Sequence, residues 1–337
     1  MTFVYEYGLF LAQTLTLVVA ILVVASGLVA LAGRSRDQGK DGLRVRKLNQ
    51  RYRDMGQTLD GALTEKRGLR RLRRRQKQED KKTRRSGGST AQEPRPRVFV
   101  LRFQGDLRAS HVESLREEVS AVLLRARPGQ DQVIVCLESP GGMVHGYGLA
   151  ASQLARLRER GIQLTAAVDR VAASGGYLMA CVAHRIVAAP FAVVGSIGVV
   201  AQLPNFHRLL KRADVDVELH TAGEHKRTLT TIGENTHAGR RKFQEELETT
   251  HELFKGFVQR YRSGLDLEEV ANGDHWYAEQ AVSLNLVDAL QTSDDLIMDC
   301  TREADVFEVT YERKQGMGKR LVLGVETAVQ RLLTRGG

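Results

Sequence analysis

The residues best suited to chemistry lie in the heptapeptide Val171–Tyr177, in which Ser174 is followed by two glycines. An apolar run, Leu164–Val168, precedes the heptapeptide, and a run of small residues, Tyr177–Ala183, follows it. This pattern predicts a serine at the junction between a strand and a helix. At a helix N-terminus the hydroxyl is exposed and the next backbone N–H groups lack partners within the helix. Ser174 is therefore a candidate nucleophile, although serine and glycine also occur at such turns for steric and capping reasons alone.

Acyl transfer by a serine also requires donors for the developing oxyanion and a base that takes up the hydroxyl proton. The backbone N–H groups around Gly175 and Gly141–Gly142 are candidate donors. For the base, two alternatives remain open. One is a histidine oriented by an acid such as Asp169, although no local pattern singles out a histidine among His145, His184, His207, His220 and His225. The other is Lys226, since a lysine accepts a proton when burial keeps it neutral.

The elements that must position these residues begin at the boundary Pro94–Pro96, after which strand-like and helix-like segments alternate. This alternation predicts an α/β domain with mostly parallel strands. The expected strands are Val98–Phe103, Gln132–Glu138 and Leu164–Val168, and the expected helices between them are Ser110–Arg125 and Val144–Arg158. Functional sites in such folds gather at the carboxyl ends of the strands. Both glycine pairs, at 141–142 and 175–176, fall at such ends.

The second half of the domain is less regular. The uncharged run Ile186–Leu203 is interrupted by proline and glycine and is rich in β-branched residues, which predicts two buried strands around a turn rather than a membrane helix. Beyond it the patterns predict a short helix at Asn205–Arg212, a strand at Val215–Thr221 and a long charged helix at Ala238–Arg262. A further short helix is predicted at Glu279–Leu284 and a C-terminal amphipathic segment at Gly316–Leu333.

The N-terminal part of the chain has a different character. Leu9–Ala32 contains 24 residues without a charge, enough for a helix to cross a bilayer, and the segment before it lacks the lysine or arginine of a signal peptide. We expect an uncleaved transmembrane anchor over 1–33, a basic stalk and linker over 34–93, and the folded domain over 94–337. Basic residues follow the span and none precede it, so the positive-inside rule places the C-terminal side in the cytoplasm.

The charge distribution narrows the possible partners. The chain carries a net charge of +10, but the segment Arg34–Arg97 alone holds 22 basic and 8 acidic residues. The folded domain is therefore not basic, and no aromatic residues are interleaved with the arginine cluster for base stacking, so no nucleic-acid partner is expected. Contact of the stalk with anionic lipid headgroups is a natural alternative. The three cysteines, Cys136, Cys181 and Cys300, form no metal-binding spacing, and no metal or other cofactor is implied.

Four motifs in sequence order resemble the signal peptide peptidase SppA family of serine proteases, and two longer stretches bring the resemblance closest to its SohB branch. The four motifs are Ser139–Gly142, Ala173–Tyr177, Gly195–Val199 and Lys226–Thr228, and the two stretches are Ser139–Ala150 and Leu219–Gly223. The N-terminal anchor and basic stalk are similar too, so the resemblance covers most of the chain. The chain has one catalytic domain where the long SppA form has two in tandem.

The resemblance implies a ClpP/crotonase-like fold of repeated ββα units and a serine endopeptidase with a Ser-Lys dyad. By matching motifs, Ser174 becomes the nucleophile, Lys226 the general base and Ser196 the residue that hydrogen-bonds the lysine. Gly141 and Gly142, with the Gly175 turn, would form the oxyanion hole. The implied substrates are small or unfolded peptides such as signal-peptide remnants, and the implied setting is the bacterial inner membrane. A complete site would require neighbouring subunits of a homo-oligomer.

Two points remain open at the level of sequence. The family's usual extracytoplasmic catalytic domain conflicts with the cytoplasmic placement that the basic stalk favours. The two functional alternatives are a catalytically inactive membrane scaffold and an acyl-CoA enzyme of the crotonase type, in which Lys226 and the Ser174 turn would be incidental.

Overall fold

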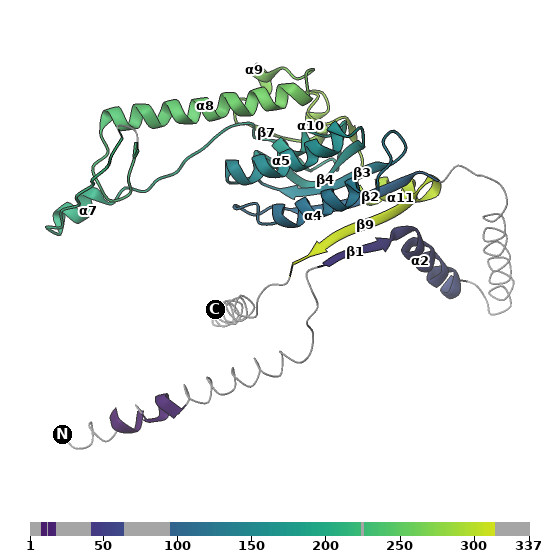
Figure 1. Ribbon diagram of the computed structural model, residues 1–337, viewed down its shortest axis with the longest axis horizontal. Coiled ribbons are helices and arrows are strands. Elements are labelled where there is room, and N and C mark those ends of the chain that lie inside the picture. The colour runs from purple at the N-terminus through teal and green to yellow at the C-terminus, as the bar shows by residue number, and fades with distance from the viewer. Residues whose placement is uncertain (1–7, 12, 18–41, 64–94, 224–225, 314–337) are drawn as a thin grey trace. The chain divides into compact units, whose positions relative to one another are not determined.

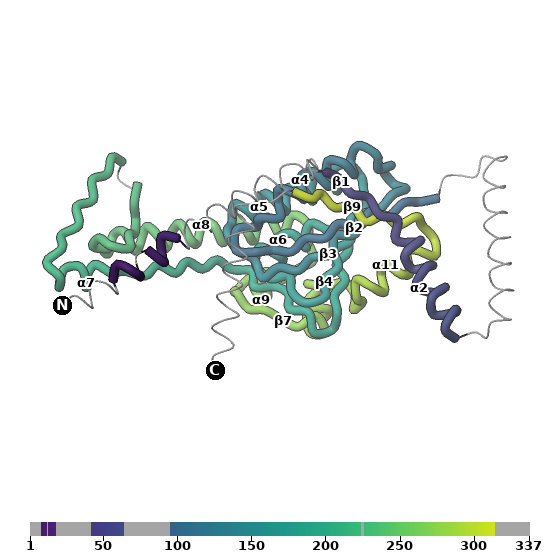
Figure 2. Tube along the Cα trace, turned by 90° about the horizontal axis from the view of Figure 1, so that it is seen from below, coloured from purple at the N-terminus to yellow at the C-terminus, as the bar shows by residue number. Residues whose placement is uncertain are grey.

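The computed structural model describes residues 8–11, 13–17, 42–63, 95–223 and 226–313. Its centre is a mixed sheet whose strands follow the order β1-β9-β2-β3-β4-β5-β8, with β6 pairing to β4 and β7 pairing to β6. The part of the sheet from β1 through β9, β2 and β3 to β4 can be followed in Figures 1 and 2. The strands are β1 Gly42–Lys47, β2 Arg97–Gln104, β3 Gln132–Ser139, β4 Gln163–Ala173, β5 Arg185–Ala188, β6 Val193–Gly195, β7 His275–Tyr277, β8 Ala289–Leu290 and β9 Asp305–Glu312.

The central strands are parallel, as the alternation of strand-like and helix-like segments predicted. The β2–β3 register pairs Val98 with Gln132, and the β3–β4 register pairs Val133 with Leu164. The helices that connect the strands are α4 Val112–Leu123, α5 Val144–Glu159 and α6 Gly175–Ala180. Parallel strands require such crossover connections, and the helices bury one face of the sheet. The α/β prediction is therefore confirmed.

Each face of the sheet has its own apolar core because neighbouring residues of a strand point to opposite faces. In β2, Phe99, Leu101 and Phe103 pack with α4, α5 and α6. Val98 and Val100 pack instead with Leu296 and Ile297 of α11 (Ser293–Glu303), on the opposite face.

The β4 strand organises the site because it pairs with two strands in succession. Residues Thr165–Val168 pair with β5, and residues Val171–Ala173 pair with β6. The run 186–203 thus contains two short strands around a turn, as predicted. The β6 strand then pairs antiparallel with β7, which places Gly195 opposite His275. The carboxyl ends of β3, β4 and β6 consequently meet at one edge.

Beyond β6 the chain leaves the sheet and returns along a long helix (Figure 1). We call residues 200–236 the arm. It contains the short helix α7 (His207–Arg212) and leads into α8 (His237–Tyr261), which is followed by α9 (Leu267–Val270) and α10 (Ala278–Ala281). The predicted strand Val215–Thr221 was wrong, because this segment forms no ladder and both Val215 and Leu219 are exposed. A β-branched pattern makes a strand only where a neighbour pairs with its backbone.

Part of the expected stalk belongs to the folded body. Residues 42–63 form β1 beside β9 and the helix α2 (Leu48–Leu63). Leu48 is 1% exposed and packs in the core that α11 covers. Asn49 donates through its Nδ2 to the carbonyl of Ala304 at 2.8 Å, and its Oδ1 accepts from the N–H of Val306 at 2.8 Å.

Most of the predicted anchor Leu9–Ala32 and the whole of the segment Gly316–Leu333 lie outside the described residues. Within the part of the chain that is described, no helix has the length and apolar character needed to cross a membrane. The anchor therefore stays a prediction.

Candidate active site

Ser174 lies between the end of β4 and the first residue of α6, as the sequence pattern indicated. Its backbone has φ 50° and ψ −117°, a conformation that non-glycine residues rarely adopt and that a firm surrounding must hold. The N–H of Ser174 donates to the carbonyl of Gly195 at 2.8 Å, which ties the turn to β6. The side chain is half-buried and lines a cavity that we call the main cavity.

The glycines around Ser174 are required by close packing. A Cβ added to Gly141, which has φ +94°, would lie 2.8 Å from the N of Gly175 and 2.8 Å from the Cβ of Ser174. A Cβ on Gly176 would approach the carbonyl oxygen of Ser139 to 2.5 Å. The Gly141 loop therefore touches the Ser174 turn directly, and no residue larger than glycine allows this approach.

A buried network supports the Gly141 loop. The hydroxyls of Ser139 and Tyr147 lie 2.6 Å apart, and Tyr147 donates to the carbonyl of Asp106 at 2.8 Å. Ser139 Oγ also accepts from the N–H of Gly141 at 3.1 Å. Because a carbonyl can only accept, the single hydroxyl hydrogen of Tyr147 goes to Asp106, and Ser139 donates to the Tyr147 oxygen. Burial also raises the pKa of Tyr147.

These contacts distinguish the three expected oxyanion donors. The N–H of Gly141 is already used by Ser139. Gly175 is the first residue of α6, so its N–H has no acceptor within the helix. In the described part of the chain, the N–H of Gly142 likewise has no acceptor. The arrangement leaves Gly142 and Gly175 available for a developing oxyanion.

Ser196 reaches the same cavity from the turn that follows β6. It has φ 52°, and its N–H donates to the carbonyl of Asp274 at 2.6 Å. Ser174, Ser196, Gly141, Gly142 and Gly175 all line a cavity of about 1190 Å³. More than half of the other lining residues are apolar: Leu107, Pro140, Met143, Val144, Leu178, Val199, Val200, Leu253, Phe254 and Phe257.

Lys226 is not brought to this cavity. It lies in the arm, its side chain is exposed, and it is not among the described residues that line the cavity. In the single chain the structure therefore unites Ser174 with Ser196 but not with Lys226.

Asp169 and His184, two of the residues considered for a triad, make their hydrogen bonds away from Ser174. The Asp169 carboxylate accepts from the N–H of Ser293 at 2.7 Å and from its hydroxyl at 2.5 Å, at the start of α11. His184 uses Nδ1 to accept from the N–H of Leu164. Asp169 is thus occupied on the other face of the sheet, and a triad that includes it does not form.

Cysteine chemistry is disfavoured at the two buried thiols. Cys136 and Cys181 are 9% and 0% exposed, as expected for small apolar residues. Burial raises the pKa of Cys136 to about 11, so this group remains a thiol at neutral pH.

The cavity lining includes a titratable residue that sequence reasoning did not select, His251. It lies on α8, is half-buried, and its Nε2 is 3.2 Å from the carbonyl oxygen of Ile197. The available signal was its spacing from Phe254 and Val258, which places the three on one side of a helix. No sequence pattern indicates which strand end that side would face.

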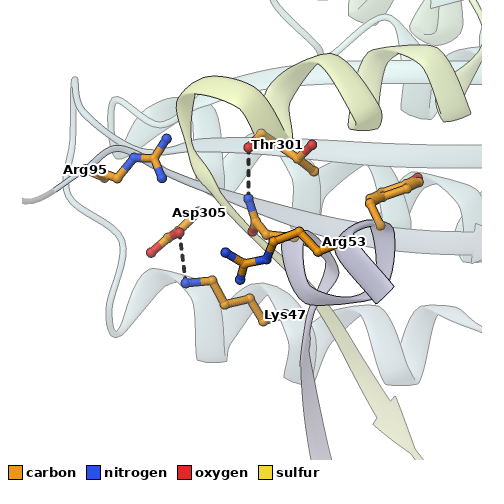
Figure 3. A pocket seen from close by; sticks show the side chains of 7 residues that line it. Lys47, Arg53, Arg95, Thr301 and Asp305 are labelled. Carbon is orange, nitrogen blue, oxygen red and sulfur yellow. Dashed lines mark hydrogen bonds and ion pairs between the residues drawn. The ribbon is translucent and has the colours of Figure 1, made fainter. Parts of the chain in front are cut away.

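A second cavity, of about 500 Å³, lies where α2 meets the end of α11 and the start of β9 (Figure 3). Lys47 pairs with Asp305 there at 2.8 Å, and Asn49 Nδ2 donates to the carbonyl of Thr301 at 3.1 Å. These bonds join the segment 42–63 to the C-terminal strand, which is a structural role.

Two family models match almost the whole chain. Residues 2–154 match peptidase family S49 N-terminal, and residues 156–307 match peptidase family S49. A "Probable protease SohB" of Haemophilus influenzae is 47% identical over 337 residues, which cover 98% of this chain and 95% of the relative. A protein of the same description from Buchnera aphidicola is 52% identical over 229 residues, 68% of each chain.

Solved structures give a more distant likeness. A lysine-to-alanine mutant of the 1510-N membrane-bound stomatin-specific protease, in complex with a substrate peptide, aligns with a TM-score of 0.41 at 12% identity. The alignment covers 68% of this chain and 98% of that one.

Proposed function

Because the chain belongs to peptidase family S49, we propose that it is a serine endopeptidase with Ser174 as nucleophile and Lys226 as general base. The observation that carries the proposal is the position of Ser174 at the N-terminus of α6, in contact distance of the Gly141 loop and open to the main cavity. A nucleophile placed beside unpaired backbone N–H groups is what acyl transfer requires.

In the proposed reaction, Ser174 Oγ attacks the carbonyl carbon of the scissile peptide bond while Lys226 Nζ takes the hydroxyl proton. The N–H groups of Gly142 and Gly175 donate to the oxyanion of the tetrahedral intermediate. The C–N bond then breaks, and Lys226 returns the proton to the leaving amine, which leaves an acyl-enzyme ester. A water molecule then attacks the ester carbonyl while Lys226 takes its proton. The bond between the acyl carbon and Ser174 Oγ breaks, Lys226 returns the proton to Oγ, and the acid is released. Ser196 is proposed to hydrogen-bond the lysine.

For the proposed reaction Lys226 must lie in the cavity beside Ser174. We propose that contact with a neighbouring subunit places it there. Lys226 is exposed in the arm, and a lysine base needs a buried setting to be neutral. The arm also exposes apolar side chains that a second copy of the chain would cover: Val200, Leu203, Phe206, Leu209, Val215, Leu219 and Ile232. Homo-oligomerisation would therefore bury the arm and complete the site.

The proposed substrates are small or unfolded peptides, such as signal-peptide remnants, bound in extended form. Support comes from the cavity wall, where Met143, Leu178 and Phe254 offer apolar contacts beside Ser174. We further propose that the chain is anchored in the bacterial inner membrane through Leu9–Ala32, with the basic stalk against anionic lipid.

We also infer that the sheet follows the ClpP/crotonase arrangement. The support is β4, which pairs with β5 through Thr165–Val168 and with β6 through Val171–Ala173. The long strand β4 thus pairs in succession with two short strands, and α6 begins directly after the second pairing.

The test is peptide hydrolysis by the purified full-length protein in detergent, with Ser174→Ala, Lys226→Ala and Lys211→Ala beside it. Lys211 is a matched control because it is an exposed lysine of α7 in the same arm. We expect the first two variants to lose activity and the third to keep it. If a soluble form is needed, it should begin before Gly42, since β1 and α2 are part of the folded body.

Other outcomes favour the alternatives. Retained activity in Lys226→Ala would assign the base to another residue, and retained activity in Ser174→Ala would exclude the proposed nucleophile. A wild type that cleaves no peptide would support the scaffold, whereas hydrolysis of an acyl-CoA thioester in its place would support the crotonase-type enzyme.

A further inference from the structure

His251 is distinguished by its place in the main cavity. Among the described residues that line the cavity, only His251 and Tyr147 carry titratable side chains. Tyr147 is fully buried, and its hydroxyl is engaged by Ser139 and Asp106. His251 is therefore the one titratable side chain that the described part of α8 contributes to the cavity, among the apolar residues Leu253, Phe254 and Phe257. The other polar residue of α8 at the cavity, Thr250, donates its hydroxyl to the carbonyl of Glu246 within the helix.

The hydrogen bond of His251 has a defined direction. Its Nε2 lies 3.2 Å from the carbonyl oxygen of Ile197, and a carbonyl can only accept. The hydrogen must therefore sit on Nε2, which donates, while Nδ1 has no role in this bond. The bond links α8 to the residue directly after Ser196, across a sequence separation of 54 residues.

The turn with Ser196 and Ile197, which His251 contacts, has a strained backbone that must be held by neighbouring residues. Ser196 has φ 52°, a left-handed conformation that persists only when the surroundings hold it. Two backbone bonds hold the turn from the sheet side: Ser174 N–H donates to Gly195, and Ser196 N–H donates to Asp274. The bond from His251 to Ile197 holds the turn from the side of α8.

From this geometry we infer that His251 is a positioning residue that fixes the Ser196 turn against α8 and so sets the direction of the Ser196 hydroxyl relative to Ser174. The inference rests on the proposed function, because orienting the lysine is the role proposed for Ser196. The helix α8 begins at His237, immediately after the arm that carries Lys226. The same bond therefore also fixes the helix that leads out of the arm against the turn with which the lysine must interact.

The test compares His251→Phe, which keeps a ring but removes the donor, with His251→Gln, whose side-chain amide can still donate. The control is His184→Phe. This variant also removes a hydrogen bond between a histidine and the backbone, since the N–H of Leu164 donates to His184 Nδ1 outside the cavity. For His251→Phe we expect kcat to fall about tenfold to a hundredfold. KM should change little because the apolar wall remains. His251→Gln should recover most of kcat, and His184→Phe should keep it.

A second measurement reports on the backbone of the Ser196 turn itself and does not depend on activity. Amide hydrogen exchange of the segment 193–198, followed by mass spectrometry, should be faster in His251→Phe than in the wild type. It should be close to wild type in His251→Gln and in His184→Phe.

The outcomes separate this inference from the proposed function. Unchanged exchange of 193–198 in His251→Phe would overturn the positioning role, whatever the enzymatic result. An unchanged kcat in that variant, or a failure of His251→Gln to restore it, would do the same. Activity that persists in Ser174→Ala would instead remove the proposed nucleophile, and the exchange experiment would still decide whether His251 holds the turn.

Discussion

Gly141 and Ser174 are in such close contact that a methyl group on Gly141 would lie 2.8 Å from the Cβ of Ser174. The two residues are 33 positions apart in the sequence and follow different strands of the sheet. Their contact brings the loop after β3 and the turn after β4 together, and it fixes where the Gly142 and Gly175 amides can point.

Gly141→Ala should abolish peptide hydrolysis, because the methyl group would push the loop away from Ser174 and the left-handed backbone would be strained as well. Gly129→Ala is the matched control, since Gly129 also has positive φ (+73°), but a Cβ added there would meet none of the described residues within 4 Å. Both variants should lose about 1 kcal/mol or more of unfolding free energy from backbone strain. Equal activity in the two variants would show that the contact is dispensable.

Tyr147→Phe should lower both stability and activity, because it removes the hydroxyl that joins Ser139 to the Asp106 carbonyl. The expected loss is about 1 to 3 kcal/mol, the cost of buried polar groups left without a partner. Tyr177→Phe is the control: Tyr177 is equally buried, and its hydroxyl donates to Leu286 at 3.1 Å outside the cavity. Thermal unfolding should shift in both variants, but kcat should fall only in the first.

Glu118 should make the stability of the protein depend on pH. It is 2% exposed, its Oε1 accepts from the N–H of Tyr311, and its Oε2 has no partner in the described structure. Burial raises its pKa from 4.5 to about 7. The folded state therefore holds a proton that the unfolded state releases above pH 4.5, so stability should fall as pH rises towards 7 and then level off.

The size of this effect should be about 3 kcal/mol, from 1.36 kcal/mol for each pH unit of the shift. Glu118→Gln should remove the dependence, because the amide oxygen can still accept from Tyr311 and carries no charge. Glu117→Gln, an exposed neighbour on α4, should leave it in place. Urea unfolding between pH 5 and 8 measures the difference, and identical curves for wild type and Glu118→Gln would contradict the prediction.

Asp131 should give the stability of the protein the opposite pH dependence at acid pH, so that stability falls as the pH is lowered. It is fully buried, and its carboxylate accepts from the guanidinium groups and backbone N–H groups of Arg97 and Arg127. These bonds lower its pKa well below the usual range, so the stability they supply is complete above about pH 4 and is lost as pH falls further.

At pH 7 Asp131→Asn should therefore cost about 2 kcal/mol or more, because two arginines lose their charged acceptor. The control Glu113→Gln removes one member of an exposed pair with Arg116 and should cost less than about 1 kcal/mol. A similar loss of unfolding free energy in the two variants would show that the buried Asp131 contacts stabilise the protein no more than the exposed ion pair does.

The sequence correctly predicted the elements whose signals are local. The strand before Ser174, the helix after it and the two short strands within 186–203 each follow from apolar runs, glycines and β-branched residues. The strand predicted over Val215–Thr221 failed because pairing partners are not encoded in the same stretch. The strand β9, which covers the edge of β2, and the folded segment 42–63 were missed for the same reason: their stability comes from contacts with residues far along the chain.

By itself, the sequence determined the α/β class, the Ser174 turn and the two glycine pairs at strand ends, because each rests on residue types at short spacing. Comparison of the whole sequence with known families showed that the chain belongs to a peptidase family. Only the tertiary structure decided that Asp169 is bonded to Ser293, that His251 is bonded to the carbonyl of Ile197, and that Lys226 lies outside the cavity in the single chain. These relationships join residues dozens of positions apart. Their distances follow from how helices pack on the sheet, which the pattern of any one segment does not specify.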